Sequence, residues 1–514
     1  MHAHGTAFAA ATLTAELAAI VSTDVPAGAT MKIEAAAGAG KSTALRLYVE
    51  ARAPRSALLL TFTSAEAKSK EAEYKHRGLD FLLASTLHAL AFAATHDLHG
   101  GHIGSSFLLS ATIVATLTST SASAWPSARL NALHRSLDVF VTSDAPAMDA
   151  SHLERITDDH GVLEAAKAVW LTACDPSASS VLLTHDAYLK VCVMEPARRT
   201  AMFSGIETVL LDEAHDCTKA QLDLVAALPR AWALVMVYDS EQRIYGWRHA
   251  AMDVYLRAIP AIAVRPLRAS WRYGPAVARL ASNLLSRHLH HRVQINGNAS
   301  LMTTICEVPG APFVRVCGIG CRLVVVARQW LSLFDVAMAG LASRAVVRID
   351  LGGTGASTMY NTFGGREQLL DVCALYLGRM EHEMLDPSTG AGRFAERGFA
   401  TYQMAARANG DQKALRACAV VEKFGAALPQ LLRRLEVAMS CQSPHCLTLL
   451  TVHAAKGGEW EYVFVHNDLK RVADLDLEDE FIQLRMLYVA ITRASRTLFL
   501  PTVIVSSWFM DIRA

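Results

Sequence analysis

The chain has 514 residues, enough for three or four compact units at roughly 150 residues each. Hydrophobic residues make up 52% and charged residues 19%, which excludes a disordered scaffold, a collagen-like repeat and a highly charged coiled coil. Lys and Arg number 49 against 48 Asp and Glu, so any polyanion must be held by local basic and aromatic grooves. Ten cysteines without a CxxC pair favour free core thiols over a metal site.

The N-terminus and the longest uncharged stretch bear on where the protein acts. The N-terminus lacks the positive region of a signal peptide and the arginines of a transit peptide, so we expect an intracellular protein, nuclear in a eukaryote and cytoplasmic otherwise. Residues 103–128 carry no formal charge but are rich in Ser and Thr, which predicts an apolar helix running into a polar loop. We expect no membrane partner.

Two clusters of short apolar runs, each run followed by a small-residue turn and an amphipathic segment, predict an α/β protein with two doubly wound domains. A mainly helical insertion is predicted in each cluster, at roughly residues 99–194 and 371–446. The predicted strands are Met31–Ala36, Ala57–Phe62, Thr208–Leu211 and Ala233–Tyr238 in the first cluster, and Leu323–Ala327, Ala345–Ile349, Leu447–Thr451, Tyr462–Val465 and Thr497–Leu500 in the second.

A phosphate loop is predicted after the first strand. Small residues let backbone N–H groups close around phosphates, and the start of the following helix adds positive potential. Lys41 would reach the β and γ oxygens of ATP and Ser42 would bind Mg²⁺. Ala35 stands where the pattern GxxxxGK[ST] has its first glycine, and the alternative is an ordinary turn before a helix. The predicted phosphate-binding residues are Ala37, Gly38, Ala39, Gly40, Lys41, Ser42 and Thr43.

A pair of carboxylates follows the apolar strand at 208–211. Asp212 would hold Mg²⁺ and Glu213 would take a proton from the attacking water as a general base. Alternatively, such a pair only complements the dipole of a helix. In combination with Lys41, it predicts a site for ATP and Mg²⁺.

Further segments, in their order along the chain, resemble the motifs of superfamily 1 helicases of the UvrD/Rep type. Within that family, the pattern points to the F-box DNA helicases, on Leu183–Lys190, Asp212–Gln221, Val420–Leu432 and Lys456–Asp468. No F-box is visible before the phosphate loop, so a stand-alone helicase core is expected. The motif-like segments are Leu58–Lys70, Ser85–Ala91, Val235–Ala250, Leu267–Ala281, Leu449–Val465 and Leu484–Ser495.

The resemblance implies two RecA-like phosphate-loop NTPase domains with parallel sheets. The first would comprise residues 1–98 plus 195–263 and the second 264–370 plus 447–514, with the helical insertions 99–194 and 371–446. For the nucleotide, it implies that Gln242 senses the γ-phosphate, Arg272 and Arg493 are arginine fingers, Trp271 stacks on adenine and Glu459 meets the ribose. For single-stranded DNA, it implies the aromatic contacts Phe62, Tyr245 and Trp247 and the polar contacts Thr61, His88, Arg248 and His453.

Three residues depart from the family pattern. Leu17 stands where the family has an adenine-reading Gln, and leucine cannot bond to a base edge, so relaxed nucleotide specificity is predicted. His215 replaces the Gln of DExQD and Gly458 the Leu of KGLEW. The second insertion is also short, which predicts weak duplex engagement there.

The predicted function is an ATP-dependent helicase and translocase on single-stranded DNA and at junctions of single and double strands. The resemblance implies movement from 3′ to 5′ and a part in DNA replication, recombination or repair. Three alternatives stay open: an ATP-driven strippase or annealing regulator with weak unwinding, a nucleotide-gated scaffold without turnover, and an RNA helicase, since stacking platforms do not test for a 2′-OH. The sequence does not identify a protein partner.

Overall fold

The chain divides into two compact units, the first ending at Arg268 and the second beginning at Ala269. The computed structural model describes residues 14–99, 103–107, 109–153, 156–157, 159–178, 180–227, 232–245, 253–289, 293–309, 322–342, 348–351, 355–378, 389–441, 446–472 and 477–509. None of the helices in these ranges combines the length and apolar character needed to cross a bilayer.

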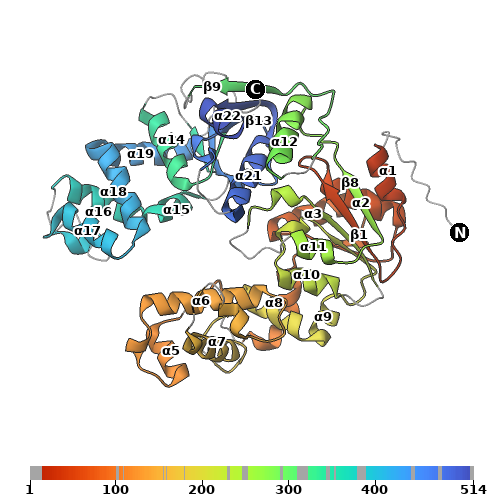
Figure 1. The fold of residues 1–514 in the computed structure, drawn as a ribbon, viewed down its shortest axis with the longest axis horizontal. Helices are drawn as coiled ribbons and strands as arrows, with labels where there is room; N and C mark the ends of the chain where they lie inside the picture. Colours follow the sequence, from red (N-terminus) through yellow and green to blue (C-terminus); the bar gives the residue numbers. More distant parts are fainter. Residues whose placement is uncertain are drawn as a thin grey trace. The chain divides into compact units, whose positions relative to one another are not determined.

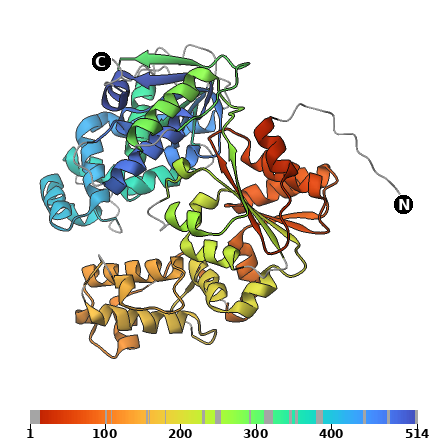
Figure 2. The ribbon, with the colours of Figure 1, turned by 45° about the vertical axis from the view of Figure 1, so that its right-hand side comes forward.

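The first unit is built on a six-stranded parallel sheet (Figures 1 and 2). Its strand order is β3-β2-β6-β7-β1-β8, so the chain crosses over repeatedly, as in doubly wound folds. Three of the central strands, β2, β6 and β7, are buried along their whole length and mainly apolar, which is typical of a parallel sheet covered on both faces. The strands are β1 (Thr30–Ala35), β2 (Ala57–Leu60), β3 (Leu82–Ser85), β6 (Thr208–Leu211), β7 (Ala233–Tyr238) and β8 (Ala263–Leu267).

The four strands predicted for this unit are confirmed, and β3 and β8 are additional. Both additional strands lie at the edges of the sheet, where only part of each strand is buried. The helices beside the sheet are α1 (Ala15–Ser22), α2 (Lys41–Arg52), α3 (Ser64–His76), α4 (Leu87–Ala94), α9 (Pro196–Met202), α10 (Lys219–Ala226) and α11 (Asp253–Ala258).

The segment predicted as the first insertion is mainly helical, and its boundaries stay a prediction. The stretch 103–128 contains a short strand and an eight-residue helix followed by a polar turn, in agreement with the predicted apolar helix and polar loop. One apolar core joins this segment to the sheet, because Phe140 and Trp170 belong to the same buried cluster as Leu211 and Met236. The elements are β4 (Ile103–Gly104), α5 (Ala111–Thr118), α6 (Ser127–Thr142), α7 (His160–Ala173), β5 (Leu183–Thr184) and α8 (His185–Met194).

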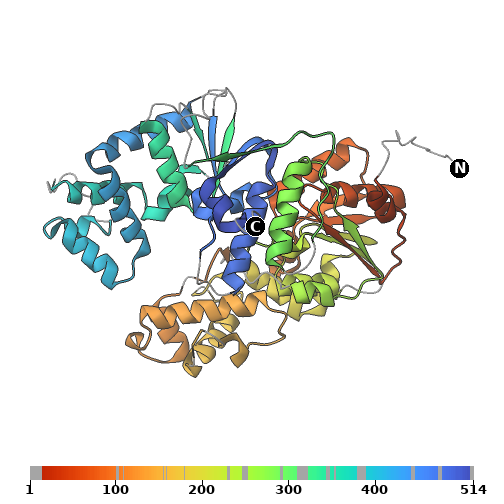
Figure 3. The same ribbon diagram turned by 45° about the horizontal axis from the view of Figure 1, so that its top comes forward.

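The second unit also has a six-stranded parallel sheet, in the order β11-β12-β10-β13-β14-β9 (Figure 3). Four predicted strands are confirmed, and the strand expected at 345–349 appears as β11, although residues 343–347 lie outside the described ranges. Strand β9 was not predicted and is again an edge strand. The strands are β9 (Thr304–Val308), β10 (Leu323–Ala327), β11 (Arg348–Asp350), β12 (Cys446–Thr451), β13 (Trp460–Val465) and β14 (Ala494–Pro501).

Helices of the second unit pack on this sheet and extend its core. Leu435 and Val421 lie in one buried cluster with Val325 and Leu449 of the sheet. The helices are α12 (Pro275–His288), α14 (Trp330–Ala342), α15 (Gly355–Tyr360), α16 (Arg366–Tyr376), α17 (Gly398–Ala408), α18 (Gln412–Phe424), α19 (Leu428–Ser440), α20 (Val452–Ala455), α21 (Leu477–Ile491) and α22 (Thr502–Phe509).

The two units use the same local device to place a histidine at the end of a strand. In the first unit, Thr86 caps α4 by accepting from the N–H of residue 89, which puts His88 in the first helical turn. In the second, Thr451 caps α20 by accepting from the N–H of residue 454, which puts His453 in the same position. Threonine is a favoured N-cap because its hydroxyl satisfies an amide that the helix leaves unbonded.

Candidate active site

Three parallel strands of the first sheet end side by side at the candidate site. In the order β6-β7-β1, Leu211 pairs with Met236 and Glu34 pairs with Tyr238, so the carboxyl ends of the strands are neighbours. The phosphate loop follows β1 and Asp212 follows β6. The carboxyl edge of such a sheet is where α/β proteins bind their ligands.

The loop between β1 and α2 has the backbone form needed to surround phosphates. Gly38 and Gly40 have φ angles of 72° and 87°, a left-handed conformation that glycine adopts without steric cost. Ala37 and Ala39 are buried and small. Helix α2 begins at Lys41, and among the described residues no side chain caps it, so its first amide groups are placed to bind an anion. This loop fits the phosphate chain of a nucleotide.

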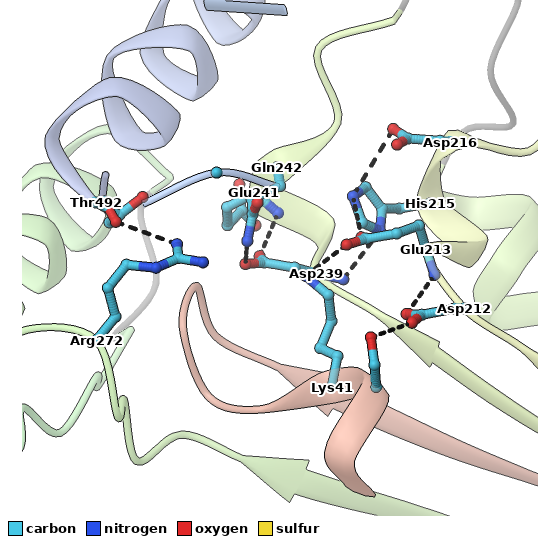
Figure 4. A network of polar contacts seen from close by, with 12 residues as sticks. Lys41, Asp212, Glu213, His215, Asp216, Asp239, Glu241, Gln242, Arg272 and Thr492 are labelled. Atoms are coloured by element: carbon cyan, nitrogen blue, oxygen red, sulfur yellow. Dashed lines mark hydrogen bonds and ion pairs between the residues drawn. The ribbon is translucent and has the colours of Figure 1, made fainter. Parts of the chain in front are cut away.

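The predicted phosphate-loop and carboxylate residues meet in the structure (Figure 4). The Ser42 hydroxyl donates to Oδ2 of Asp212 at 2.5 Å, and Nζ of Lys41 lies 3.2 Å from Oε1 of Glu213. Asp212 is buried. A hydroxyl beside a carboxylate is an oxygen donor set that suits Mg²⁺, which binds through few protein ligands and keeps several waters.

Charges in this cluster shift the pKa values of their neighbours. Burial and the Glu213 carboxylate raise the pKa of Asp212. Burial alone would lower the pKa of Lys41, but the charges of Glu213, Asp239 and Asp212 raise it above its usual value. Burial and the charges of Asp212 and Glu213 also raise the pKa of Glu66 to about 7. The negative charge gathered here is the kind that a bound cation would neutralise.

A second set of contacts connects Glu213 to the segment after β7. Oδ2 of Asp239 accepts from Nε2 of Gln242 at 2.6 Å, and the Asp239 N–H donates to Nδ1 of His215 at 3.1 Å. Nε2 of His215 lies 3.3 Å from Oε2 of Glu213 and 3.7 Å from Oδ1 of Asp216. Ligand atoms of Glu213, His215 and Asp216 all lie within 4.8 Å of one another, a spacing that would also suit a metal ion.

The predicted strand contacts of the first unit lie beside this cluster. The rings of Phe62 and Tyr245 stack, with 5.5 Å between centroids and 25° between planes. Thr61, Phe62 and His88 line a small pocket that Asp212 also lines. Nε2 of His88 lies 3.0 Å from Oδ1 of Asp186.

Two further predicted contacts, Trp247 and Arg248, lie outside the described residues. The roles of all these residues in binding a strand stay predictions.

Predicted nucleotide contacts of the second unit also gather in one place. Nε of Arg272 lies 3.0 Å from Oε2 of Glu459, and its NH1 group donates to the Thr492 carbonyl at 3.2 Å. Arg493 is buried and donates to the carbonyls of Val489 and Gly458 at 2.9 and 3.3 Å. The arginine-finger roles of Arg272 and Arg493 remain predictions.

Trp271, beside Arg272, is 55% exposed. An exposed ring is what a stacking platform requires, and the stacking of Trp271 on adenine stays a prediction.

His453 lies in a polar pocket of the second unit that sequence reasoning did not anticipate. The pocket has a volume of about 310 Å³. Its walls combine two arginines, an aromatic ring and hydroxyl groups: it is lined by Arg328, Gln329, Trp330, Leu331, Thr362, Arg416, Thr451 and His453. Positive charge beside an aromatic ring is the chemistry expected of a single-strand contact.

Two of the departures from the family pattern have a structural reason. Leu17 is buried in α1, where it contributes to the core. A Cβ atom at Gly458 would lie 2.3 Å from the ring of Trp460, so a larger residue there would displace that ring.

Sequence reasoning missed Asp239 and Glu66. Asp239 follows β7 as Asp212 follows β6, so the rule that picks out strand ends would have found it. Glu66 lies in the first turn of α3, which Thr63 caps. An acidic residue there usually only complements the helix dipole, so no pattern marks it as part of the site.

The chain is similar to known helicases. Residues 177–262 match the model of the UvrD/REP helicase N-terminal domain, and residues 447–500 match that of the UvrD-like helicase C-terminal domain. The chain is 25% identical to F-box DNA helicase 1 of Gallus gallus over 95% of its own length and 49% of the relative. It is 27% identical to F-box DNA helicase protein 1 of Schizosaccharomyces pombe over 53% of its own length and 33% of the relative. The chain thus spans about half or less of each relative.

Proposed function

The chain is a homologue of the UvrD/Rep-type superfamily 1 helicases, similar to the F-box DNA helicases, and on that premise we propose that it is an ATP-driven motor on single-stranded DNA. The observation that carries this proposal is the contact between the phosphate loop and the carboxylates, with Ser42 bonded to Asp212 and Lys41 beside Glu213. Nucleotide hydrolysis needs both parts in one place.

Each residue has a separate task in the proposed hydrolysis. Bound Mg²⁺ would supply positive charge that stabilises the phosphate groups. Ser42 and Asp212 would hold it, and Lys41 would bind the same phosphate oxygens. Glu213 would take a proton from the attacking water, and Gln242 would contact the γ-phosphate. Arg272 and Arg493 would stabilise the charge that develops as the phosphate is released.

The strand would contact the aromatic pair Phe62 and Tyr245 and the polar groups Thr61, His88 and His453. Stacking holds bases without regard to sequence, which suits a motor that must move along any strand. We propose movement from 3′ to 5′, separation of duplex at junctions, and a part in replication, recombination or repair inside the cell. The relatives are named as DNA helicases, which favours DNA over RNA as the track.

The proposal is tested by ATP hydrolysis in the presence of single-stranded DNA, single-stranded RNA or no nucleic acid, followed by unwinding of duplexes with a 3′ or a 5′ tail. We expect stimulation by DNA above RNA and unwinding of the 3′-tailed duplex, with Lys41→Ala as the inactive control. Equal stimulation by RNA would favour an RNA helicase. Hydrolysis that clears bound protein from a strand but separates no duplex would favour a strippase. Absence of hydrolysis in the wild type would refute the motor.

A further inference from the structure

His215 is a buried histidine whose two ring nitrogens contact different parts of the candidate site (Figure 4). Nδ1 accepts the backbone N–H of Asp239 at 3.1 Å. A nitrogen that accepts a hydrogen bond carries no proton, so in the neutral ring the proton is on Nε2. Nε2 lies 3.3 Å from the Oε2 atom of Glu213. The Asp239 amide therefore selects the tautomer whose protonated Nε2 faces Oε2 of Glu213, a close polar contact that does not have hydrogen-bond geometry.

Neighbouring residues hold both the backbone and the carboxylate of Glu213 in place. Its backbone has φ 51° and ψ 40°, a left-handed conformation that costs a residue other than glycine about 1–3 kcal/mol and persists only where the surroundings enforce it. Oε1 lies 3.2 Å from Nζ of Lys41. In the proposed reaction Lys41 also binds phosphate, whereas the contact between His215 and Oε2 does not involve a group that binds nucleotide. His215 is therefore placed to hold the base while the lysine is engaged elsewhere.

The other side of His215 leads to the predicted γ-phosphate sensor. The Asp239 residue that donates to His215 also accepts from Nε2 of Gln242 at 2.6 Å and from the Glu241 N–H at 3.1 Å. Residues 239–242 thus form a turn with internal hydrogen bonds, and Tyr245, which stacks on Phe62, follows it three residues later. The contacts run without a break from this turn through His215 to Glu213.

We propose that His215 is a positioning residue that sets the orientation of the Glu213 carboxylate according to the conformation of the turn at 239–242. When Gln242 contacts the γ-phosphate, or Tyr245 contacts a DNA strand, the turn rearranges. The Asp239 amide then moves the imidazole of His215, which in turn reorients the Glu213 carboxylate. The inference rests on the proposed function and adds to it a route by which the strand accelerates hydrolysis. Such a route is established only by a coupling measurement.

The test compares three variants of the full chain. His215→Leu removes the polar contacts with the Asp239 amide, Glu213 and Asp216, and His215→Gln keeps one acceptor and one donor in its amide group. His152→Leu is the matched control, because His152 is equally buried but contacts Asp149 and Phe140 in the helical segment. Steady-state ATP hydrolysis is measured with and without oligo(dT), and ATPγS affinity and thermal unfolding are measured separately.

We expect His215→Leu to keep its affinity for ATPγS within about threefold, to lose about 10- to 100-fold in kcat and to lose most of its stimulation by oligo(dT), as when an outer contact of a catalytic group is removed. His215→Gln should restore kcat and stimulation to near the wild type. His152→Leu should lower only the unfolding temperature. A positioning role thus separates kcat from nucleotide affinity, which a general loss of packing would not do.

Two outcomes would overturn this inference but leave the proposed function intact. In the first, His215→Leu keeps the wild-type kcat and stimulation by oligo(dT). In the second, kcat and ATPγS affinity fall by the same factor within each of the variants His215→Leu and His215→Gln. If His215→Leu does not fold, His215→Asn, whose shorter amide reaches only one of the two neighbours, takes its place with the same expected loss. A wild-type protein without ATP hydrolysis would instead refute the proposed function, and this inference with it.

Discussion

Tyr245→Ala is the most direct test of the strand-binding surface on the first unit. The rings of Phe62 and Tyr245 are 5.5 Å apart with 25° between their planes, the arrangement of an aromatic pair in direct contact. If a DNA base stacks on the outer face of Tyr245, the variant loses the stacking of one base, about 1–3 kcal/mol. At about 1.4 kcal/mol per tenfold change, this weakens Kd about 5- to 150-fold.

A base that inserts between the two rings gives a smaller loss. Insertion has to break the ring pair, which contributes about 0.5–1.5 kcal/mol. The alanine variant no longer bears that cost, so its net loss of binding free energy falls to between about −0.5 and 2.5 kcal/mol. The contact distance of the pair favours the outer face, and we expect the larger value.

The assay is fluorescence anisotropy of labelled oligo(dT) without nucleotide, at one fixed salt concentration because phosphate contacts make Kd depend on salt. Phe62→Ala, Tyr245→Ala and the double variant form a cycle, and we expect a coupling energy of at least about 0.5 kcal/mol between the two rings. Tyr376→Ala, which removes a 41% exposed ring from α16, is the control and should bind normally. A folded Tyr245→Ala protein whose Kd stays within about twofold would refute stacking of a base on the outer face of Tyr245, since the weakest effect expected of such a stack is about fivefold.

Three further predictions follow from the site and the core. Lys41→Ala should abolish phosphate release, whereas Glu213→Gln should still bind ATP and hydrolyse it about 10²- to 10⁴-fold more slowly; wild-type turnover in Glu213→Gln would rule out its role as the base. Because Leu17 is a buried residue whose side chain cannot form hydrogen bonds with a base edge, ATP should be preferred over GTP only weakly in competition assays. A preference of several hundredfold would show that another group recognises the base. Burial lowers the pKa of Lys190 from 10.5 to about 8, so between these pH values the unfolded state binds more protons and the free energy of unfolding rises with pH. The test is urea unfolding of the wild type and of Lys190→Met at pH 7.5 and at pH 10. The free energy of unfolding of the wild type minus that of the variant should be larger at pH 10, and an equal difference at the two pH values would contradict the prediction.

The central strands could be predicted from the sequence because parallel strands covered on both faces are continuous apolar runs. Strands β2, β6 and β7 are wholly buried and were found from that signal. Strand β8 was missed because alternate residues are exposed at the edge of the sheet, and β9 at the edge of the other sheet is also only partly buried. Edge strands are defined by their single neighbour, which a local pattern does not show.

The site also combines contacts that a local sequence pattern predicts with contacts that depend on the folded neighbours. The meeting of Lys41 with Glu213 follows from the rule that carboxyl ends of parallel strands share one edge, together with the motif at each end. The contact of His215 with the Asp239 amide depends on the register of β6 against β7 and on the turn after each, so no spacing in the sequence predicts it. The sequence marked His215 only as a departure from the family pattern.

The ion pair between Arg272 and Glu459 joins two side chains that act on different parts of the nucleotide in the proposed function. Both residues were predicted to act on nucleotide, yet here each is the partner of the other at 3.0 Å. The Arg272 side chain is only 12% exposed but that of Glu459 is 63% exposed, so solvent screens the charge of the carboxylate and weakens the ion pair. A phosphate group offers a guanidinium stronger, charge-assisted bonds. The ion pair therefore costs little to break, and its presence is compatible with a later contact of Arg272 with phosphate and of Glu459 with a ribose.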